Sequence, residues 1–406
     1  MSSIAKRTLL VLASTYPRWA ADPEPGFVHE LCRRLVDTFD VIALVPDAPG
    51  ADPSGMLDGV RVIRYRYAPR RLQTLVNHGG IAVNLKRSRW KWLLVPGFIL
   101  AQYLAARRLA RADRIDVVHA HWLLPQGLIA RHLGVPYLVT SHGGDLFGLR
   151  GRLLTALKRL VAGSARAMTV VSSAMRDEAS RLLITPPHLS VLPMGVDLRE
   201  HFVPDRAQLR RADEILFVGR LVPKKGLRHL LDAMPAVLQA RPAARLTIVG
   251  FGPEAESLQR QSVGLGIDAN VTFLGARRQA ELPDFYRRAS VFVAPFVRDD
   301  SGDQEGLPVA LMEAIGCGCP IVVGRVPGLQ DLLGDAVDQL CVEPGRPDAL
   351  ADAILGVLDN PEPAEARTEA IRARALQTID WQYVALGYAG LLAMCAEGTP
   401  IPASGR

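Results

Sequence analysis

The chain has 406 residues, 49% of them hydrophobic, which excludes a disordered protein and predicts two or three packed domains. Residues 1–195 hold 26 Lys and Arg against 13 Asp and Glu, whereas the remaining residues hold 22 against 28. The basic first half indicates an anionic partner. Because no nucleic-acid motif accompanies this charge, nucleic acid is not the expected partner.

The start of the chain is interpreted as a buried strand. Thr8–Leu12 runs straight into Tyr16-Pro17-Arg18, unlike the apolar core of a secretory signal. The longest apolar run, Trp92–Ala101, is interrupted by Pro96-Gly97, so no membrane-spanning segment is expected. The five cysteines lack the spacing of a zinc or redox motif, so we expect reduced core thiols, a cytoplasmic location and no metal site.

Short apolar runs alternate with longer amphipathic ones along the whole chain. Strands are predicted at Leu9–Ala13, Val41–Val45, Val60–Tyr65, Val117–His119, Tyr137–Thr140, Ile215–Val218, Leu246–Val249, Val271–Leu274, Val291–Ala294 and Ile321–Val323. Helices are predicted between them, for example at Leu227–Gln239 and Ala349–Leu358. Continuous apolar strands with crossover helices are typical of parallel sheets that helices cover on both faces.

The sequence therefore predicts an α/β protein with two domains of similar size, residues 1–195 and 196–378. The turn Pro193–Asp197 and the arginine-rich stretch after it mark the boundary. A last amphipathic helix within residues 379–396 is expected to cross back to the N-terminal domain. The tail after Glu397 is expected to be disordered.

A basic and aromatic segment occupies residues 86–100. Lys86–Trp92 places four cations and two tryptophans in seven residues, and six large apolar residues follow by Leu100. This composition suits the surface of an anionic membrane, where each cation contributes about 1 kcal/mol. The alternative is a solvated helix start whose tryptophans belong to the core.

Histidines follow two strands of the first domain. His119, His121 and Trp122 end one strand and could line a carbohydrate site, or they are simply strand-end residues. Ser141-His142-Gly143-Gly144-Asp145 follows the next strand, where glycines allow a ligand to approach the backbone closely. Asp145 is expected either to orient His142 or to cap the next helix.

The second domain begins with a strand that ends in Val218-Gly219-Arg220-Leu221-Val222-Pro223-Lys224-Lys225-Gly226. Open α/β sheets bind ligands at this end of their strands. Arg220 can bind a phosphate bidentately and Lys225 can act as a point charge on a leaving diphosphate. A solvated basic turn is the alternative for this segment taken alone.

Two further strands of this domain end in loops that could meet a nucleotide. Val249-Gly250-Phe251-Gly252 has closely spaced glycines, which is a weak signal alone. The backbone near Ala276 and Arg277, after the next strand, could face a nucleobase.

The segment EGLPVALME, from Glu305 to Glu313, is the most informative part of the sequence. Pro308 suits the first position of a helix, where a missing N–H costs little. Two acids near the N-terminal end of one helix can bind the hydroxyls of a sugar and a ribose, and the exposed backbone N–H groups at that end can bind phosphate. These features predict a site for a nucleotide sugar.

Four segments of the second half resemble, in the same order, segments of the retaining glycosyltransferases of family 4: GRLVPKKG, VGFGP, VTFLG and QEGLPVALMEAIGCGCPIVV. The segment PMGVD resembles the link between the two domains of that family. The resemblance covers most of the second half. It implies a GT-B fold, with two Rossmann-like domains facing each other across a cleft that holds the active site. It also implies a metal-independent transferase that needs no cofactor and takes a nucleotide-diphosphate sugar as donor.

The resemblance also implies roles for individual residues. Arg220 and Lys225 would hold the donor diphosphate, with Gly219 and Gly250 in the loops beside it. Glu305 and His142 would contact the transferred sugar. Glu313 would bind the ribose, and the N–H groups of Gly306 and Leu307 would add phosphate contacts.

The loop from Ser14 to Phe27 resembles a branch of the family that acts in exopolysaccharide assembly, of the colanic-acid type. Gly26 would let the helix that starts near Phe27 approach the donor phosphate or the acceptor. Arg18 and Trp19 would be acceptor contacts.

The predicted function is the retaining transfer of a hexose-type sugar to a hydroxyl of a lipid-linked or polysaccharide acceptor, in the cytoplasm or at the inner face of the membrane. No carboxylate nucleophile stands out in the first domain, which favours a front-face reaction. The alternatives are a sugar phosphorylase or a nucleotide-sugar epimerase on the same fold, and a non-catalytic nucleotide-sugar-binding protein.

Overall fold

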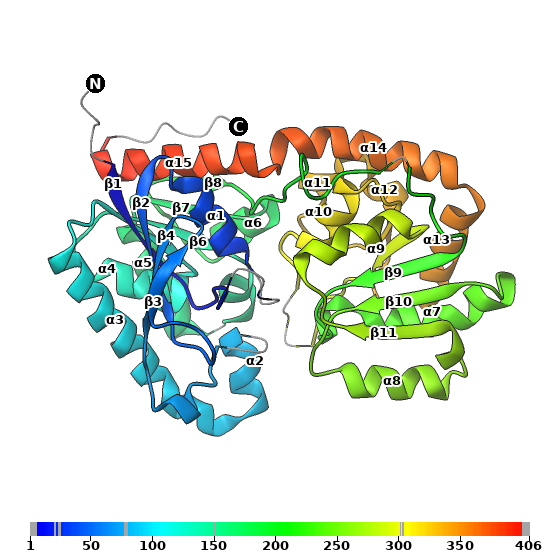
Figure 1. The fold of residues 1–406 in the computed structure, drawn as a ribbon, viewed down its shortest axis with the longest axis horizontal. Helices are drawn as coiled ribbons and strands as arrows, with labels where there is room; N and C mark the ends of the chain where they lie inside the picture. Colours follow the sequence, from blue (N-terminus) through cyan, green and yellow to red (C-terminus); the bar gives the residue numbers. More distant parts are fainter. Residues whose placement is uncertain are drawn as a thin grey trace. The chain divides into compact units, whose positions relative to one another are not determined.

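The computed structural model describes residues 6–19, 22, 26–76, 80–149, 151–205, 207–300, 302 and 304–399. They form two compact units, each built on a sheet (Figure 1). Unit 1 holds the chain up to Pro193 together with the residues from Val384 onward, and unit 2 holds Met194–Tyr383. Residues 400–406 of the tail that was expected to be disordered lie outside the described residues.

The sheet of unit 1 has eight strands in the order β3-β4-β2-β1-β5-β6-β7-β8. Neighbours are parallel except β3 and β4, which are antiparallel. The strands are β1 (Arg7–Leu12), β2 (Phe39–Pro46), β3 (Ser54–Leu57), β4 (Val60–Tyr65), β5 (Val117–His121), β6 (Tyr137–Ser141), β7 (Ala167–Val170) and β8 (Leu189–Val191). The helices are α1 (Phe27–Leu35), α2 (Gly80–Arg87), α3 (Leu94–Ala112), α4 (Leu128–Arg131), α5 (Arg152–Ser164) and α6 (Ser173–Arg181).

The sheet of unit 2 has six strands in the order β11-β10-β9-β12-β13-β14, all parallel. They are β9 (Glu214–Val218), β10 (Arg245–Val249), β11 (Val271–Gly275), β12 (Val291–Ala294), β13 (Ile321–Gly324) and β14 (Cys341–Val342). The helices are α7 (Leu227–Ala240), α8 (Ala255–Gly264), α9 (Leu282–Arg288), α10 (Val309–Gly316), α11 (Leu329–Leu333), α12 (Val337–Leu340), α13 (Pro347–Asp359) and α14 (Pro361–Thr378).

The strands of unit 2 bury both faces, as their continuous apolar sequences predict. Ile215 and Phe217 of β9 belong to one buried cluster, whereas Leu216 between them belongs to another. The same alternation separates Val291 from Phe292 in β12. Each face of the sheet therefore has its own core under its own helices, which fixes the register of the strands that carry the site.

All ten predicted strands are present, but four more were missed. The sequence did not identify β3, β7, β8 and β14, which are short strands at or near the edges of the sheets. β3 is largely exposed and β14 has only two residues, so neither carries the apolar run that identifies a buried strand.

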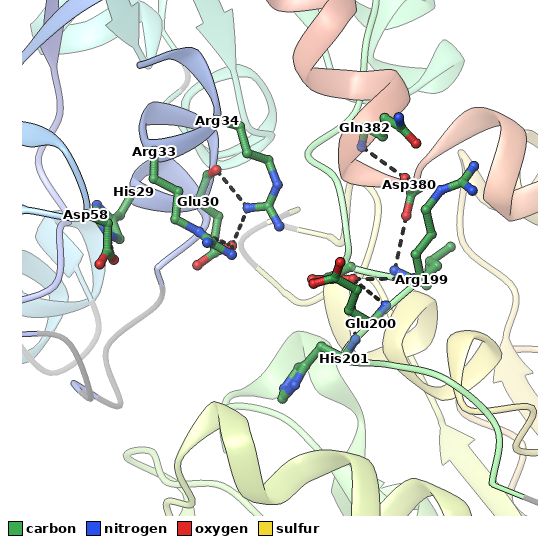
Figure 2. Close-up of polar contacts among 12 residues, drawn as sticks. His29, Glu30, Arg33, Arg34, Asp58, Arg199, Glu200, His201, Asp380 and Gln382 are labelled. Atoms are coloured by element: carbon green, nitrogen blue, oxygen red, sulfur yellow. Dashed lines mark hydrogen bonds and ion pairs between the residues drawn. The ribbon is translucent and has the colours of Figure 1, made fainter. Parts of the chain in front are cut away.

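The link between the units is anchored inside unit 2 by Asp380. Its carboxylate accepts hydrogen bonds from the backbone N–H of Leu198 at 3.2 Å and from Nε of Arg199 at 3.1 Å (Figure 2). It also accepts one from the N–H of Gln382 at 3.0 Å. A buried carboxylate with three donors holds the chain where it leaves unit 2 toward the last helix.

The last helix, α15 (Trp381–Glu397), is drawn in red after α14 (Figure 1). Its first three residues belong to unit 2, and the rest belong to unit 1. Tyr388 is fully buried in unit 1, where its hydroxyl donates to the carbonyl of Leu192 at 3.0 Å. Near the end of the helix, Glu397 pairs with Arg7 at 2.8 Å.

Candidate active site

Three charged side chains of unit 2 meet just before α10. Lys225 Nζ lies 3.3 Å from Oε2 of Glu305, and Lys224 Nζ lies 3.4 Å from Oε1. The Glu305 side chain is only 12% exposed. Burial alone would raise the pKa of this carboxyl, but attraction to the two lysines outweighs burial and lowers the pKa to about 2. Glu305 is therefore ionised at neutral pH, with a lysine ammonium group close to each of its two carboxylate oxygens.

Lys225 is held close to the protein interior. Burial lowers the pKa of its ammonium group, while the charge of Glu305 opposes this shift. Its Nζ also lies over the ring of Phe296, 5.0 Å from the centroid, which is a cation–π geometry. The charge of the half-buried Arg220 contributes to the lowered pKa, so Arg220 belongs to the same electrostatic environment.

The loop geometry explains why both lysines reach one carboxylate. Pro223–Lys225 form a single 3₁₀ turn, and Gly226 follows with φ of +67° as the N-cap of α7. A Cβ on Gly226 would lie 1.8 Å from the carbonyl oxygen of Pro295, so only glycine fits. This contact packs the turn against the end of β12 and turns consecutive side chains toward Glu305. The sequence predicted Lys225 but missed Lys224, since two adjacent lysines look alike without the turn.

The helix after Glu305 starts one residue later than predicted. Pro308 is the N-cap of α10, with ψ of 119°, and the helix begins at Val309. The prediction that Pro308 takes the first helical position was wrong by one residue. Among the described residues, no acceptor pairs with the N–H groups of Gly306 and Leu307. Together with the start of α10, these groups offer donors for an anion.

Glu313 lies inside α10 and is 4% exposed. Burial raises the pKa of its carboxyl, while the hydrogen bonds that it accepts lower it. Oε2 accepts from the hydroxyl of Tyr286 at 2.8 Å, and Oε1 accepts from Nε2 of Gln279 at 2.6 Å. The sequence missed both partners, because Tyr286 lies on α9 and Gln279 lies in the turn before it.

The glycines at the strand ends allow neighbouring loops to touch. A Cβ on Gly250 would lie 1.8 Å from the carbonyl oxygen of Gly219, so Gly250 is required by loop packing. A Cβ on Gly219 would make only ordinary contacts, the nearest at 3.6 Å. Ala276 and Arg277 follow β11 and are both exposed. These loops lie at the carboxyl ends of adjacent parallel strands β9, β10 and β11 (Figure 1).

In unit 1, three histidines at the ends of β5 and β6 form a cluster in which His119 and His121 are buried and His142 is half-buried. His121 Nδ1 lies 2.9 Å from His142 Nε2, and the rings stack at 5.1 Å. The rings of His119 and His121 lie 4.2 Å apart. Burial lowers the pKa of His119 and of His142 to about 3, and that of His121 well below its usual value. All three rings are therefore neutral at physiological pH.

Of the two roles predicted for Asp145, the helix cap is wrong, and its contact with His142 is to the backbone. It does not touch the His142 ring and it caps no helix. One carboxylate oxygen accepts from the hydroxyl of Ser141 at 2.8 Å and from the backbone N–H of His142 at 3.3 Å, and the other from the N–H of Leu123 at 2.7 Å. Asp145 thus ties together the two loops that carry His121 and His142.

The loop after β1 carries the remaining predicted residues. Gly26 is the N-cap of α1, which begins at Phe27 as expected. Phe27 packs its ring 5.0 Å from that of His142. Arg18 donates to Asp22 at 2.6 Å and lies over the ring of Trp19, which is 44% exposed. Residues 20, 21 and 23–25 of this loop lie outside the described residues.

Comparison with known proteins places this fold and these residues in one family. Glycosyltransferase Family 4 matches residues 27–200, and Glycosyl transferases group 1 matches residues 205–374. Sucrose-phosphate synthase from Thermosynechococcus elongatus has the same architecture, with a TM-score of 0.78 at 20% identity, over 97% of this chain and 100% of that one. The chain therefore has the GT-B fold, an α/β fold with two Rossmann-like domains on parallel sheets.

Two curated relatives are similar in sequence. The GDP-mannose-dependent alpha-(1-6)-phosphatidylinositol monomannoside mannosyltransferase of Mycolicibacterium smegmatis is 33% identical over 63% of this chain and 70% of its own length. Glycogen synthase of Mycobacterium tuberculosis is 26% identical over 97% of this chain and 96% of its own length. Fold and sequence together define an enzyme that transfers a sugar from a nucleotide-sugar donor. The chain belongs to the retaining glycosyltransferases of family 4.

Proposed function

We propose that this enzyme transfers a hexose-type sugar, with retention, to a hydroxyl of a lipid-linked or polysaccharide acceptor in cell-surface glycan synthesis. The observation that supports donor binding is the cluster of Lys224 and Lys225, in the turn before α7, around Glu305, just before α10. Two segments of unit 2 meet here: one carries the lysine cations, and the other carries the ionised carboxylate and, among the described residues, the backbone N–H groups without an acceptor. A diphosphate needs the cations and the N–H groups, and a sugar hydroxyl can donate a hydrogen bond to the carboxylate.

The cations would act on the leaving group. As the bond between sugar and diphosphate breaks, negative charge grows on the departing phosphate oxygen, and positive groups fixed beside it stabilise that charge. Lys225 is nearly buried, so its attraction is weakened little by water. Arg220 would add a bidentate contact and Gly306 and Leu307 their N–H groups, with Gly219 and Gly250 shaping the loops around the phosphates.

The other residues would orient the reactants. We propose that Glu305 and His142 contact the transferred sugar and that Glu313 binds the ribose, with the base against the backbone near Ala276 and Arg277. His142 is neutral, which allows it to donate or accept a hydrogen bond without adding charge. In a front-face reaction the leaving phosphate oxygen takes the proton of the acceptor hydroxyl, so no protein nucleophile is required.

A membrane surface would bring the enzyme to a lipid-linked acceptor. The 3₁₀ turn Arg89–Leu93 and α3 expose Trp90 at 46%, Trp92 at 59% and Leu93 at 81%. The alternative in which these tryptophans belong to the core is therefore wrong. Leu100 and Leu104 extend the exposed apolar stripe along α3, whereas Leu94 and Phe98 are buried on the opposite face.

Charge around this stripe favours an anionic surface. Between Asp58 and Asp113 the sequence has twelve Lys and Arg and no Asp or Glu. Arg87 and Arg89 are exposed, but Lys91 donates to Asn84 and to the carbonyl of Thr74, so it contributes less than predicted. We propose that residues 86–100 dock on the anionic inner face of the membrane and that the protein is peripheral to it.

The helical stretch Arg89–Ala112 also has the length and apolar composition of a membrane span, with 28% of its most apolar window buried. The expectation that Pro96-Gly97 would interrupt such a run was wrong, because Pro96 lies in the first turn of α3, where its missing N–H is not needed. Phe98 packs against the rings of Tyr65 and Tyr67, at 5.6 and 5.3 Å. These contacts support a helix that lies on the membrane over one that crosses it.

Two finer assignments are part of the same proposal. Because of the sequence of the loop Ser14–Phe27, we assign the protein to the exopolysaccharide or colanic-acid-type branch of the family. We also propose that Gly26, Arg18 and Trp19 lie near the bound acceptor. Family membership disfavours a phosphorylase, an epimerase or a non-catalytic binder.

The experiment is a screen of uridine, guanosine and adenosine diphosphate sugars by thermal shift, followed by donor turnover with and without acceptor. A transferase is stabilised by its donor and hydrolyses it slowly when no acceptor is present. A phosphorylase would instead release sugar phosphate from a glycoside and inorganic phosphate. Absence of stabilisation by every donor would contradict the proposal.

A further inference from the structure

Unit 1 contains a polar pocket at the carboxyl ends of β1, β2 and β4. It is separate from the histidine cluster. Ser14, Thr15, Tyr16 and Arg18 come from the loop directly after β1, and Arg64 approaches from β4. Every lining residue belongs to unit 1 and to the described part of the chain.

Arg64 is a half-buried cation, and among the described residues no acidic side chain pairs with it directly. Burial lowers the pKa of its guanidinium group. Nη2 donates to the carbonyl of Pro17 at 2.5 Å and Nη1 to the carbonyl of Pro46 at 3.3 Å. Among the described residues, no carboxylate lies within ion-pair distance of this side chain. A buried charge that is paired only with carbonyl dipoles is costly, and an anion in the pocket would offset that cost.

The nearby acids are already engaged. Asp47 accepts from Nε of Arg66 at 3.2 Å and from Nε2 of Gln73 at 3.1 Å. The buried Asp22 accepts from Nε and Nη2 of Arg18. Among the described residues, Arg64 is therefore the cation of this pocket that no carboxylate pairs with directly.

Hydroxyl donors complete the wall. Among the described residues, the side chains of Ser14 and Thr15 have no hydrogen-bond partner. Two successive hydrogen bonds hold Tyr16 in place. Asp58 lies 2.8 Å from Nε2 of His29, and Nδ1 of His29 lies 2.8 Å from the Tyr16 hydroxyl. Figure 2 shows His29 beside Asp58. Because a carboxylate only accepts, Nε2 carries the proton, and in the neutral ring Nδ1 accepts from Tyr16.

We propose that this pocket binds a phosphate ester group of the acceptor, with Arg64 as the ion-pair partner and the Ser14 and Thr15 hydroxyls as donors. A planar guanidinium fork beside unpaired hydroxyl groups matches the oxygen atoms of a phosphate. This inference rests on the proposed function only in calling the ligand an acceptor. The phosphate can belong to a lipid headgroup or to a soluble sugar phosphate.

The first experiment is calorimetric titration of the full-length protein with inorganic phosphate, at constant ionic strength set with chloride, in a Lys225→Met background that weakens the phosphate site of unit 2. Phosphate is expected to bind, and Arg64→Met is expected to weaken binding by about tenfold or more. The matched control, Arg61→Met, removes an exposed cation from the same strand and should leave the affinity within about twofold.

A second variant controls for misfolding, because Arg64 also donates hydrogen bonds to the carbonyls of Pro17 in the loop and Pro46 at the end of β2. Ser14→Ala with Thr15→Val removes only the hydroxyl donors and should weaken phosphate binding about threefold or more. Absence of phosphate binding above the chloride baseline in the parent protein, or an affinity unchanged in both variants, would overturn the inference. The proposed function fails by another observation, namely no stabilisation of the wild type by any nucleotide sugar.

The source of the phosphate is separated by two further probes. Glucose 1-phosphate represents a soluble ester, and vesicles of phosphatidylinositol in phosphatidylcholine represent a lipid headgroup, with pure phosphatidylcholine as the blank. A dependence on Arg64 with either probe supports the pocket and identifies the source. Binding of both probes without dependence on Arg64 counts against it.

Discussion

Lys225 Nζ lies 3.3 Å from Glu305 Oε2, and both side chains are nearly buried, at 13% and 12% exposure. This pair holds an acid and a base in their charged forms without a ligand. Lys224 adds a second ammonium on the other carboxylate oxygen. A diphosphate would then meet ammonium groups that are already held in place, so little reorganisation is needed when the leaving group develops charge.

The first prediction concerns these cations. Arg220→Ala together with Lys225→Ala should lower the rate of sugar transfer by about a hundredfold or more, because each cation stabilises charge that grows in the transition state. The measurement is kcat/KM for the donor found by the thermal-shift screen. Arg260→Ala, which removes an exposed cation from α8, is the control. Transfer within about tenfold of the wild type in the double variant would contradict the assignment.

The second prediction concerns stability at acid pH. The pKa of Glu305 is about 2 in the folded protein and near 4.5 in the unfolded chain. Its contribution, on the order of 3 kcal/mol, is therefore present above pH 4.5 and is lost as the pH falls toward 2. Urea unfolding should show that the free energy of unfolding falls less between pH 6 and pH 3 in Glu305→Gln than in the wild type. Glu256→Gln, at an exposed position of α8, should keep the wild-type slope.

The third prediction concerns the histidine cluster. The folded pKa of His119 and of His142 is about 3, below the ordinary value of 6.5, so the unfolded state binds more protons between these values. These rings should make the free energy of unfolding rise with pH from about 3 to 6.5 and remain level above. Nitrogen-15 NMR of labelled histidine should show both rings neutral at pH 5. An imidazolium signal from either ring at that pH would show that the cluster is solvated.

The fourth prediction tests the ribose role of Glu313. Glu313→Gln should weaken the binding of a ribonucleoside diphosphate by about tenfold. It should weaken the binding of the 2′,3′-dideoxy analogue far less, because only the ribose hydroxyls lose an anionic acceptor. Calorimetric dissociation constants for both ligands give the comparison. Tyr286→Phe keeps the carboxylate and removes only the 2.8 Å hydrogen bond, so its effect should be smaller. Equal losses for the two ligands would assign Glu313 to packing.

The fifth prediction concerns the exposed apolar stripe. Trp92→Ser with Leu93→Ser should lower flotation with phosphatidylglycerol vesicles by about tenfold and change little with phosphatidylcholine alone. Leu209→Ser is the matched control, since Leu209 is 86% exposed and lies in unit 2. If the double variant floats with vesicles as well as the wild type does, residues 86–100 do not dock on the membrane.

Local sequence was sufficient for most of the fold. The strand at Val60–Tyr65 and the helix from Leu227 were predicted almost to the residue, because alternation and turn glycines are local signals. Edge strands such as β3 and β14 were missed, since an edge strand lacks a continuous apolar run. The helix start at Pro308 shifted by one residue, which is within the usual uncertainty of a cap.

The residue types of the site came from the sequence by itself, because phosphate and hydroxyl ligands demand particular charges at the ends of particular strands. Lys224 beside Glu305, Tyr286 on Glu313, His121 on His142 and the unpaired Arg64 were decided by tertiary structure. Each of these contacts joins segments that are remote in the chain or depends on the direction of one turn. Burial then set the charge state of each group, and burial exists only once the chain has packed.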